Sequence, residues 1–442
     1  MLRALKKALP ERSPLRLWWH AGKAFVAALR AGFPARKLVV IGVTGTDGKT
    51  TTVGMVAHIL NATGRRCGAL STAFTVIGDK RTENATHLTS VSPGMLQRSL
   101  RTMVDAECAF AVLECSSHGL VQHRLDWTWP AVAAVTNTSL EHLDYHGTME
   151  RYRADKGRLF RMIKPNGTKV LNADDDSFDG YVAIPSRWTI HTSAKRVFGP
   201  PENDATCGFW IADVAVTPTS CTATVRCNAE KGEWLLSLNI PGAFNCHNAL
   251  TAIACAHAAG VPVADCVAAL ATFEGIPGRL ERIDEGQPFS VYVDFAVSPN
   301  AYGSTLDTLR KAIGPTNRVL VLCSSCGNRM REKRPVVGEI CSEKADVVVV
   351  TEDETYGEDP MVALDEVWNG VHKDRCDAHK IPDRRDAIRF VFQAARPGDA
   401  VALCGMGPFT TMTTLQGRVP WDERAIAREL LQEYKPHKNP TL

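Results

Sequence analysis

The amino-acid sequence predicts an α/β fold, with a large and mostly parallel sheet followed by a second, smaller α/β domain. Between residue 38 and about residue 272, short apolar runs alternate with segments of helical spacing, as is typical of parallel sheets. The 442 residues suffice for two or three domains of ordinary size. The alternation pauses at Gly275-Ile-Pro-Gly278 and then resumes, so we expect a domain junction there.

Each series predicts its own set of strands and helices. The first series predicts strands at 38–43, 110–114, 131–136 and 169–172, helices at 95–104 and 149–160, antiparallel strands within 205–240 and an alanine-rich helix over 245–260. The second series predicts strands at 290–294, 318–323, 346–351 and 400–404. We therefore expect a basic N-terminal segment (1–37), a central domain (38–275) and a C-terminal domain (276–442).

The composition is that of a soluble globular protein. Hydrophobic residues make up 45% of the chain and charged residues 22%, and a net charge of +3 gives no reason to expect a nucleic-acid partner. No run of 18 uncharged apolar residues predicts a membrane span. The fourteen cysteines are scattered, many in apolar runs, which suggests the reducing cytoplasm. The single pair Cys323 and Cys326 is weak support for a metal or redox centre.

The first 37 residues form a basic segment with amphipathic character. Nine lysines and arginines stand against the single acid Glu11, and bulky apolar residues alternate with them. Charges interrupt the apolar residues, unlike in a signal peptide. The segment is interpreted as a surface helix packed on the next domain, with peripheral contact to an anionic membrane face as the alternative.

A glycine-containing run at 43–52 follows the first predicted strand and precedes helical spacing. Gly45 and Gly48 permit a tight turn, and backbone N–H groups at a helix start attract phosphate. Lys49 can reach the terminal phosphates of a nucleotide, and the Thr50 hydroxyl can ligate Mg²⁺. Val43 stands where the general motif has its first glycine, and an ordinary turn before a helix is the alternative.

Several further motifs follow this loop. They are Gly45–Thr50, Leu113–Arg124, Thr136–Gly147, Tyr152–Lys156, Phe244–Asn248, Pro277–Arg279 and Lys333–Pro335. In this order, and over nearly everything from residue 38 onward, the chain resembles the Mur ligase family, and within it the tripeptide synthetases of the MurE type. The resemblance implies a P-loop central ATPase domain and a C-terminal Rossmann-like α/β domain.

The resemblance also implies an ATP-dependent, ADP-forming ligase of peptidoglycan precursor synthesis. A substrate carboxylate is activated as an acyl phosphate, and the amine of an added amino acid displaces phosphate to form an amide. ATP and Mg²⁺, in two sites, are the implied cofactors. The implied partners are small-molecule substrates, with no nucleic acid, and the implied location is the cytoplasm.

The family's functional residues carry over to matching positions of this sequence. For ATP they are Gly45, Thr46, Asp47, Gly48, Lys49, Thr50, Thr51, Asn248 (adenine) and Asp294 (ribose). For catalysis they are Lys49, Lys156 and Arg279, and for Mg²⁺ Thr50, Glu114, His142 and Lys156, the lysine as its carbamate. For the muramoyl-peptide substrate they are Thr89, Ser90, Ser116, Ser117, Gln122 and Arg124. The alternatives are a solvated strand-end acid for Glu114, a solvated helix charge for Lys156, a helix-start cap for Asn248, and structural roles for His142 and for Ser116, Ser117, Gln122 and Arg124.

Departures from the family pattern concern the substrates. About 37 residues precede the phosphate loop, where the family carries a domain that binds the UDP moiety. The family's Asp-Asn-Pro-Arg, which selects meso-diaminopimelate, is replaced here by Asp353-Glu-Thr-Tyr356. The family's Gly-Lys-Gly-His-Glu near the C-terminus is replaced by Gly405-Met-Gly-Pro-Phe409. We predict that meso-diaminopimelate is not the preferred acceptor. Glu354 is interpreted as a surface loop acid, with a partner for a cationic acceptor as the alternative.

Two other functions remain open on the sequence. The same ligase chemistry on a non-muramoyl substrate, as in folylpolyglutamate synthases or specialised metabolism, is the first. A weakened ATP-binding subunit of a complex is the second.

Overall fold

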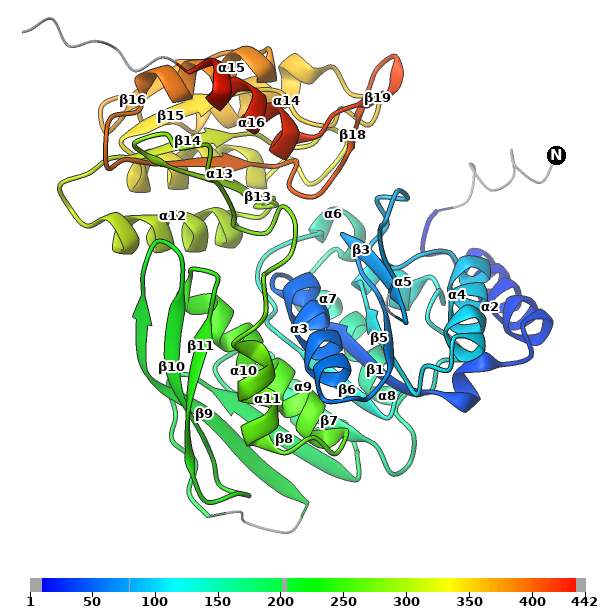
Figure 1. Cartoon of the computed structure of the whole chain (residues 1–442). Helices are drawn as coiled ribbons and strands as arrows, with labels where there is room; N and C mark the ends of the chain where they lie inside the picture. Colours follow the sequence, from blue (N-terminus) through cyan, green and yellow to red (C-terminus); the bar gives the residue numbers. More distant parts are fainter. Residues whose placement is uncertain (1–9, 79, 201–204, 435–442) are drawn as a thin grey trace, which may run out of the picture.

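The computed structural model describes residues 10–78, 80–200 and 205–434. Within them an 11-stranded sheet, built from residues 39–238, defines the large domain, and a 6-stranded sheet, built from residues 281–404, defines the small domain (Figure 1). The predicted α/β class, with a mostly parallel sheet and a second smaller domain, is confirmed. The boundary between residues 275 and 276 stays a prediction.

The large sheet is parallel at its centre and antiparallel at both edges. In spatial order its strands are β11 (Glu233–Leu238), β10 (Cys221–Cys227), β9 (Thr206–Val216), β8 (Trp188–Ser193), β7 (Thr168–Asn172), β6 (Val132–Val135), β1 (Val39–Thr44), β5 (Phe110–Glu114), β2 (Cys67–Leu70), β3 (Phe74–Ile77) and β4 (Lys80–Glu83). Strands β9 to β2 in this order pair in parallel. The predicted strands of the first series are confirmed, as is the antiparallel character of 205–240.

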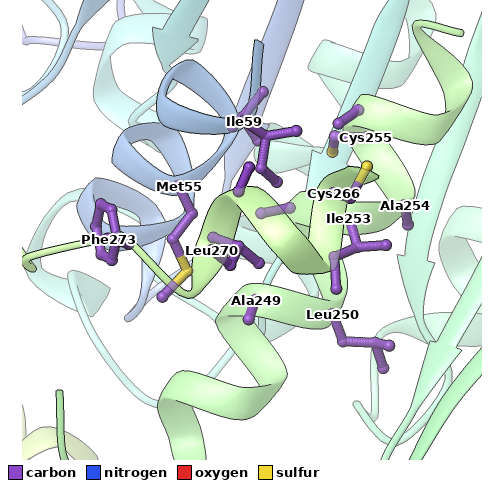
Figure 2. Packing of buried hydrophobic residues seen from close by; sticks show 14 of the residues in the cluster. Met55, Ile59, Ala249, Leu250, Ile253, Ala254, Cys255, Cys266, Leu270 and Phe273 are labelled. Atoms are coloured by element: carbon purple, nitrogen blue, oxygen red, sulfur yellow. The ribbon is translucent and has the colours of Figure 1, made fainter. Parts of the chain in front are cut away.

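Helices cover both faces of the large sheet because its strands carry apolar residues on both sides. They are α2 (Pro14–Arg30), η1 (Pro34–Lys37), α3 (Lys49–Ala62), α4 (Pro93–Asp105), α5 (Ser117–Val121), α6 (Leu143–His146), α7 (Met149–Lys156), α8 (Arg158–Arg161), α9 (Phe178–Val182), α10 (Ala243–Ala258) and α11 (Val263–Leu270). On one face, Met55 and Ile59 of α3 pack with Ile253 of α10 and Leu270 of α11 (Figure 2). The helix predicted over 149–160 is interrupted at Gly157, which separates α7 from α8.

The small domain is a second parallel sheet between two layers of helices. Its strands, in spatial order, are β12 (Glu281–Ile283), β13 (Ser290–Asp294), β17 (Ala400–Cys404), β14 (Val319–Cys323), β15 (Val347–Val350) and β16 (Asp377–Lys380), and β18 (Thr411–Thr414) and β19 (Gly417–Pro420) form a hairpin. Its helices are α12 (Pro299–Ile313), α13 (Lys333–Lys344), α14 (Pro360–Asn369), α15 (Arg384–Ala394) and α16 (Glu423–Glu433). All four strands predicted for the second series are present, and within the six-stranded sheet only β12 pairs antiparallel.

The cysteines are free thiols, and most are buried as small apolar side chains. Across the described residues, we find no helix with the length and apolar character needed to traverse a bilayer.

Candidate active site

A cavity of about 660 Å³ opens between the two domains, at the carboxyl ends of β1, β5 and β6. The phosphate loop after β1, the loops after β5 and β6, the start of α10 and several loops of the small domain line it. Ligands of open parallel sheets bind at this edge, because the loops that follow adjacent strands converge there.

The phosphate loop needs glycine at two positions. Gly45 and Gly48 have φ of 150° and 80°, in the left-handed region that glycine adopts readily. A Cβ on Gly45 would lie 1.9 Å from Thr136 Oγ1, and one on Gly48 would lie 2.2 Å from Asn248 Oδ1. Because α3 begins at Lys49, its first N–H groups are free of helical partners and can bind an anion.

All but one of the predicted loop residues line the cavity. Those that line the cavity are Thr46, Asp47, Gly48, Lys49, Thr50 and Thr51. Gly45 lies behind them, against Thr136. The Lys49 ammonium donates to Thr46 O over 2.7 Å, and burial lowers the Lys49 pKa.

Glu114, Thr50 and Arg279 form a chain of contacts at the end of β5. The Thr50 hydroxyl lies 3.1 Å from both Glu114 carboxylate oxygens and accepts a hydrogen bond from Arg279 Nη2 over 3.0 Å. Glu114 is buried and also accepts from the backbone N and the hydroxyl of Thr72. It is therefore not a solvated strand-end acid. Arg279 Nε is buried and has no hydrogen-bond partner among the described residues. An oxygen of a bound phosphate could accept a hydrogen bond from it.

Lys156 lies behind the phosphate loop and does not line the cavity. Its buried ammonium donates to Gly45 O over 2.6 Å and lies 4.2 Å from the centre of the Tyr152 ring. Burial, with a further contribution from the Lys49 charge, lowers the pKa of Lys156 well below its ordinary value. A lysine in this setting favours the neutral amine.

The four predicted metal ligands do not converge on one point. Thr50 and Glu114 are in contact, and their oxygens fit the hard ligands that Mg²⁺ prefers. His142 lines the cavity with its ring 4.8 Å from His118, and desolvation, with His118 and nearby lysines, lowers its pKa, which favours the neutral ring that can ligate a metal. No group of three or more His, Cys, Asp or Glu side chains in the described part of the chain is arranged to hold a metal. Thr50 and Glu114 thus fit one Mg²⁺, and His142 is a separate candidate ligand for a second.

Asn248 and Asp294 both line the cavity. Asn248 lies inside α10, which begins at Ala243, and its side chain donates to Asn245 Oδ1 over 3.1 Å; the helix-start cap is therefore wrong. Asp294 ends β13 and accepts from the backbone N of Leu280 over 3.0 Å and from the Thr305 hydroxyl over 2.6 Å. Burial raises the Asp294 pKa despite these bonds.

The residues predicted to contact the muramoyl peptide divide into two groups. Thr89, Ser90, Ser116 and Arg124 line the cavity, and Arg124 donates to Ser90 O over 2.8 Å. Gln122 and Ser117 lie outside the lining.

The side chains of Gln122 and Ser117 both contact other residues of the protein. Gln122 Oε1 accepts two hydrogen bonds from the Arg124 guanidinium. Ser117 is 2% exposed and lies 3.0 Å from His146 Nε2, so the structure gives it a structural contact in place of the predicted substrate contact.

Glu354 is a buried residue of the cavity wall, and its interpretation as a surface loop acid is wrong. Thr413 donates to it from its backbone N and its hydroxyl, over 3.1 and 2.8 Å, and the Tyr356 hydroxyl donates to its second oxygen. His87 of the large domain lies 3.4 Å away and stacks on Phe409 with ring centres 3.8 Å apart. Burial alone would raise the pKa of Glu354, but His87 and the hydroxyl groups lower it.

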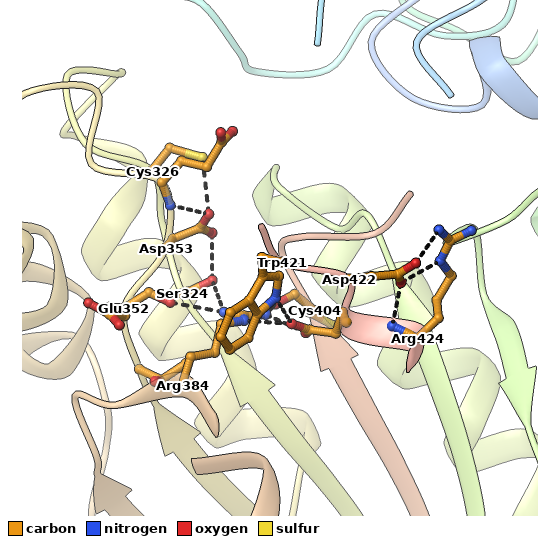
Figure 3. Close-up of polar contacts among 12 residues, drawn as sticks. Ser324, Cys326, Glu352, Asp353, Arg384, Cys404, Trp421, Asp422 and Arg424 are labelled. Atoms are coloured by element: carbon orange, nitrogen blue, oxygen red, sulfur yellow. Dashed lines mark hydrogen bonds and ion pairs between the residues drawn. The ribbon is translucent and has the colours of Figure 1, made fainter. Parts of the chain in front are cut away.

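A rigid polar network lies under this corner of the cavity (Figure 3). Asp353 accepts from the Ser324 hydroxyl over 2.6 Å and from the backbone N of Glu354 over 2.7 Å. Arg384 is fully buried, pairs with Glu423 over 2.6 Å and donates to Cys404 O over 2.7 Å. The ends of β14, β15 and β17 are thereby tied together, which fixes the position of Glu354.

The cavity wall also contains residues to which the sequence analysis gave no role, among them Asn137, Lys333, Arg329 and His87. Asn137 accepts from the backbone N of Asp47, and Lys333 pairs with Glu141 across the domains over 2.8 Å. Arg329 lies over the Tyr356 ring at 4.5 Å. Lys333 and Asn137 stand in motifs that the resemblance picked out, whereas nothing local distinguishes Arg329 and His87.

Comparison with known proteins identifies the family. Residues 43–256 match the Mur ligase middle domain, and residues 278–407 match the Mur ligase glutamate ligase domain. The UDP-N-acetylmuramyl-tripeptide synthetase of Roseiflexus sp. (strain RS-1) is 36% identical over 427 residues, which cover 92% of this chain and 81% of the relative. The chain belongs to the Mur ligase family.

Other Mur ligases are similar over most of this chain. The UDP-N-acetylmuramoyl-L-alanyl-D-glutamate–2,6-diaminopimelate ligase of Geobacillus kaustophilus (strain HTA426) is 34% identical, covering 93% of this chain and 82% of the relative. A solved structure of an enzyme of that name has 29% identity and a TM-score of 0.60, covering 90% and 79% of the two chains.

The fold of this Mur ligase is also similar to that of a folylpolyglutamate synthase. The ADP complex of Mycobacterium tuberculosis folylpolyglutamate synthase has a TM-score of 0.66 at 18% identity, covering 87% of this chain and 91% of that one. At this identity the likeness concerns the fold alone.

Proposed function

We propose that this Mur ligase is an ATP-dependent, ADP-forming peptide ligase of the MurE type, acting in peptidoglycan precursor synthesis. The observation that carries the proposal is the chain of contacts Glu114–Thr50–Arg279 beside Lys49. It brings a carboxylate, a hydroxyl and two cationic side chains together at one end of a nucleotide-sized cavity. The proposed location, where ATP is available, is the cytoplasm.

The proposed reaction has two steps. An oxygen of the substrate carboxylate attacks the γ-phosphorus of ATP, the bond to the β-phosphate oxygen breaks, and ADP leaves. The neutral amine of the amino acid then attacks the acyl carbon, phosphate leaves, and the amine loses a proton. No protein side chain acts as a nucleophile.

The side chains would orient the reactants and stabilise charge. Lys49 and Arg279 are placed to balance the negative charge of the transferring phosphoryl group. Thr50 and Glu114 would hold Mg²⁺, which neutralises charge on the phosphate oxygens when bound. Asn248 and Asp294 are the proposed adenine and ribose contacts. Thr89, Ser90, Ser116 and Arg124 form the proposed wall for the carboxylate substrate.

We further propose that Lys156 is carbamylated, with His142 in the second metal site. Carbamylation requires a neutral amine, and burial of Lys156 favours that form. Mass spectrometry of the intact protein in bicarbonate-containing and CO₂-free buffer tests this, with Lys156→Gln as the control. The proposal predicts a carbamate mass that the variant lacks. Equal masses for wild type and variant in both buffers, apart from the substitution itself, would contradict it.

The proposed acceptor is an amino acid other than meso-diaminopimelate. Glu354 is already paired with Thr413, Tyr356 and His87, and Phe409 adds an apolar ring beside them. Few groups at this corner are left to bind the second ammonium and carboxylate groups of meso-diaminopimelate. A charged group left without partners there would lower the affinity strongly.

Phosphate release tests the function. The substrate is UDP-muramoyl-dipeptide with ATP and Mg²⁺, and single amino acids are added in turn, including meso-diaminopimelate, lysine and alanine. We expect release that depends on both the dipeptide and one amino acid, and that is lost in Lys49→Ala. Release stimulated far more by meso-diaminopimelate than by the other amino acids would overturn the acceptor proposal but keep the function.

Two outcomes would favour the remaining alternatives. Release with a different carboxylate substrate, and none with the muramoyl dipeptide, would indicate the same chemistry in another pathway. No turnover with any carboxylate or amine would indicate a weakened ATP-binding subunit.

A further inference from the structure

Helix α2 has two apolar faces. The inner face packs on the protein, and the outer face is largely exposed, with Phe25 at its border packing on Phe33 and Trp127 (ring centres 6.3 and 5.3 Å apart). The inner face is formed by residues that recur at helical spacing: Leu17, Ala21, Ala24 and Ala28. Ala24 and Ala28 are buried. The helix packs through this small-residue face against α4, and it forms the outermost layer of the large domain (Figure 1). The favoured interpretation of the N-terminal segment, a helix packed on the next domain, is thus confirmed for α2.

The outer face of α2 carries the large apolar side chains. They form one stripe along the helix: Leu15 (64% exposed), Trp18 (82%), Trp19 (54%), Phe25 (42%), Val26 (42%) and Leu29 (56%). A solvent-facing helix normally presents polar residues on this side. An exposed stripe of this size indicates a surface that binds something apolar.

A line of cationic residues runs along one edge of this stripe. Arg16, Lys23 and Arg30 are seven residues apart, which places them one above the other on the helix. No acid lies within α2, and Glu11, which pairs with Arg16, is the one acid between residues 10 and 37. Because Arg16 is paired with Glu11, the net positive charge of this edge comes from Lys23 and Arg30.

We propose that the outer face of α2 lies on the surface of an anionic lipid bilayer. Tryptophan and leucine side chains enter the boundary between headgroups and acyl chains, and lysine and arginine at the edge contact the anionic headgroups. The inner face stays packed on α4, so the helix lies flat and carries the large domain to the membrane. This proposal is independent of the reaction proposed above.

A second copy of the chain fits this face less well. If two α2 helices paired antiparallel through their apolar stripes, the two-fold axis would bring both cationic edges to the same side. Like charges would then face each other with no acid in either helix to separate them. An anionic surface complements the edge instead.

Co-sedimentation of the full chain with lipid vesicles tests the proposal. We expect binding to vesicles of phosphatidylcholine with phosphatidylglycerol, weaker binding to phosphatidylcholine alone, and loss of the difference at high salt. Trp18→Ser with Trp19→Ser is expected to weaken binding at least about tenfold, because two large apolar side chains no longer enter the bilayer. Lys23→Glu with Arg30→Glu is expected to weaken binding to the anionic vesicles selectively.

The matched control is Leu235→Ser. Leu235 is 72% exposed and lies on β11, an edge strand of the large sheet that does not contribute to the outer face of α2. This variant should bind vesicles like wild type. Both serine variants should keep the wild-type thermal unfolding, because the altered side chains face solvent. Absence of vesicle binding, or equal binding by the Trp18/Trp19 variant, would overturn the proposal. So would a dimer in sedimentation equilibrium that the Trp18/Trp19 variant abolishes without any vesicle binding.

Discussion

At the residue scale, one hydroxyl group joins the elements of the proposed phosphoryl-transfer site. Thr50 Oγ1 donates to Glu114 at the end of β5 and accepts from Arg279, which follows the domain junction. A serine could make the same two contacts, whereas an alanine could make neither.

We therefore expect Thr50→Ala to lower the rate of phosphate release about 100-fold or more, and Thr50→Ser to keep most of it. Loss of the hydroxyl removes a proposed Mg²⁺ ligand and leaves Glu114 and Arg279 without their shared contact. Steady-state kinetics with saturating ATP measures this. An alanine variant within a few-fold of the serine variant would contradict the expectation.

We expect His118 to make the stability of the ligand-free protein depend on pH. Burial, with a smaller contribution from His146, lowers the His118 pKa from 6.5 to about 3. Between these values the unfolded chain binds a proton that the folded protein does not, so stability falls as the pH falls through 6.5.

Replacing this histidine should remove its part of the pH dependence. We expect wild type to lose more stability than His118→Asn when the pH is lowered from above to below 6.5. Urea unfolding of both proteins at several pH values provides the measurement. Parallel curves for the two proteins would show that His118 is protonated in the folded state.

At the element scale, a buried network connects the N-terminal segment to α7, the helix that ends at Lys156. Arg12 makes two hydrogen bonds to Asp155, over 2.7 and 3.1 Å, and Asp155 also contacts His146 over 2.7 Å. Ser117 completes the network on the far side of His146. These contacts hold α7 against α5 and α6, and so they fix the direction of Lys156.

Removal of Arg12 should loosen this connection. We expect Arg12→Ala to lower the free energy of unfolding by about 2 kcal/mol, since Asp155 stays buried with one partner fewer. Arg101→Ala is the matched control: Arg101 and its partner Asp105 are both more than half exposed, so loss of this pair should cost about 0–1 kcal/mol. Thermal or urea unfolding compares the two. Equal effects would mean that the Arg12 contact adds no more than a surface ion pair.

At the scale of the whole molecule, polar contacts hold the two domains together around the cavity. Asp47 of the phosphate loop accepts from Ser298 and Asn300 of the small domain, over 3.1 and 3.0 Å. Glu141 and Lys333 form a pair across the domains with both side chains at least 93% buried. Gly278 has φ of 64°, and a Cβ there would lie 2.1 Å from the Gly407 backbone, so the junction tolerates no larger residue without movement.

Breaking the Glu141–Lys333 pair should separate the domains. In Lys333→Met the Glu141 carboxylate loses its charged partner, and opening of the domains would return it to water. We expect a larger radius of gyration by small-angle X-ray scattering in the absence of nucleotide. The double variant Glu141→Gln with Lys333→Met should be more compact than the single one. A single variant as compact as wild type would contradict the expectation.

The sequence by itself determined the order of the strands along the chain, the class of fold and the position of the phosphate loop. These depend on local properties: the apolar runs that become β1, β5 and β17, and the left-handed backbone that Gly45 and Gly48 adopt without strain. Cavity-lining side chains at the ends of apolar runs, such as Glu114 on β5 and Asp294 on β13, could be predicted for the same reason.

Only the tertiary structure decided where several side chains considered for function point. Ser117 turns to His146, Lys156 turns to the carbonyl of Gly45 behind the loop, and Glu354 is buried against His87 from the other domain. Each depends on partners far away in the chain, which no local pattern encodes. The same holds for α2: the sequence predicted an amphipathic helix, but only packing on α4 showed that its small residues face inward and its tryptophans face solvent.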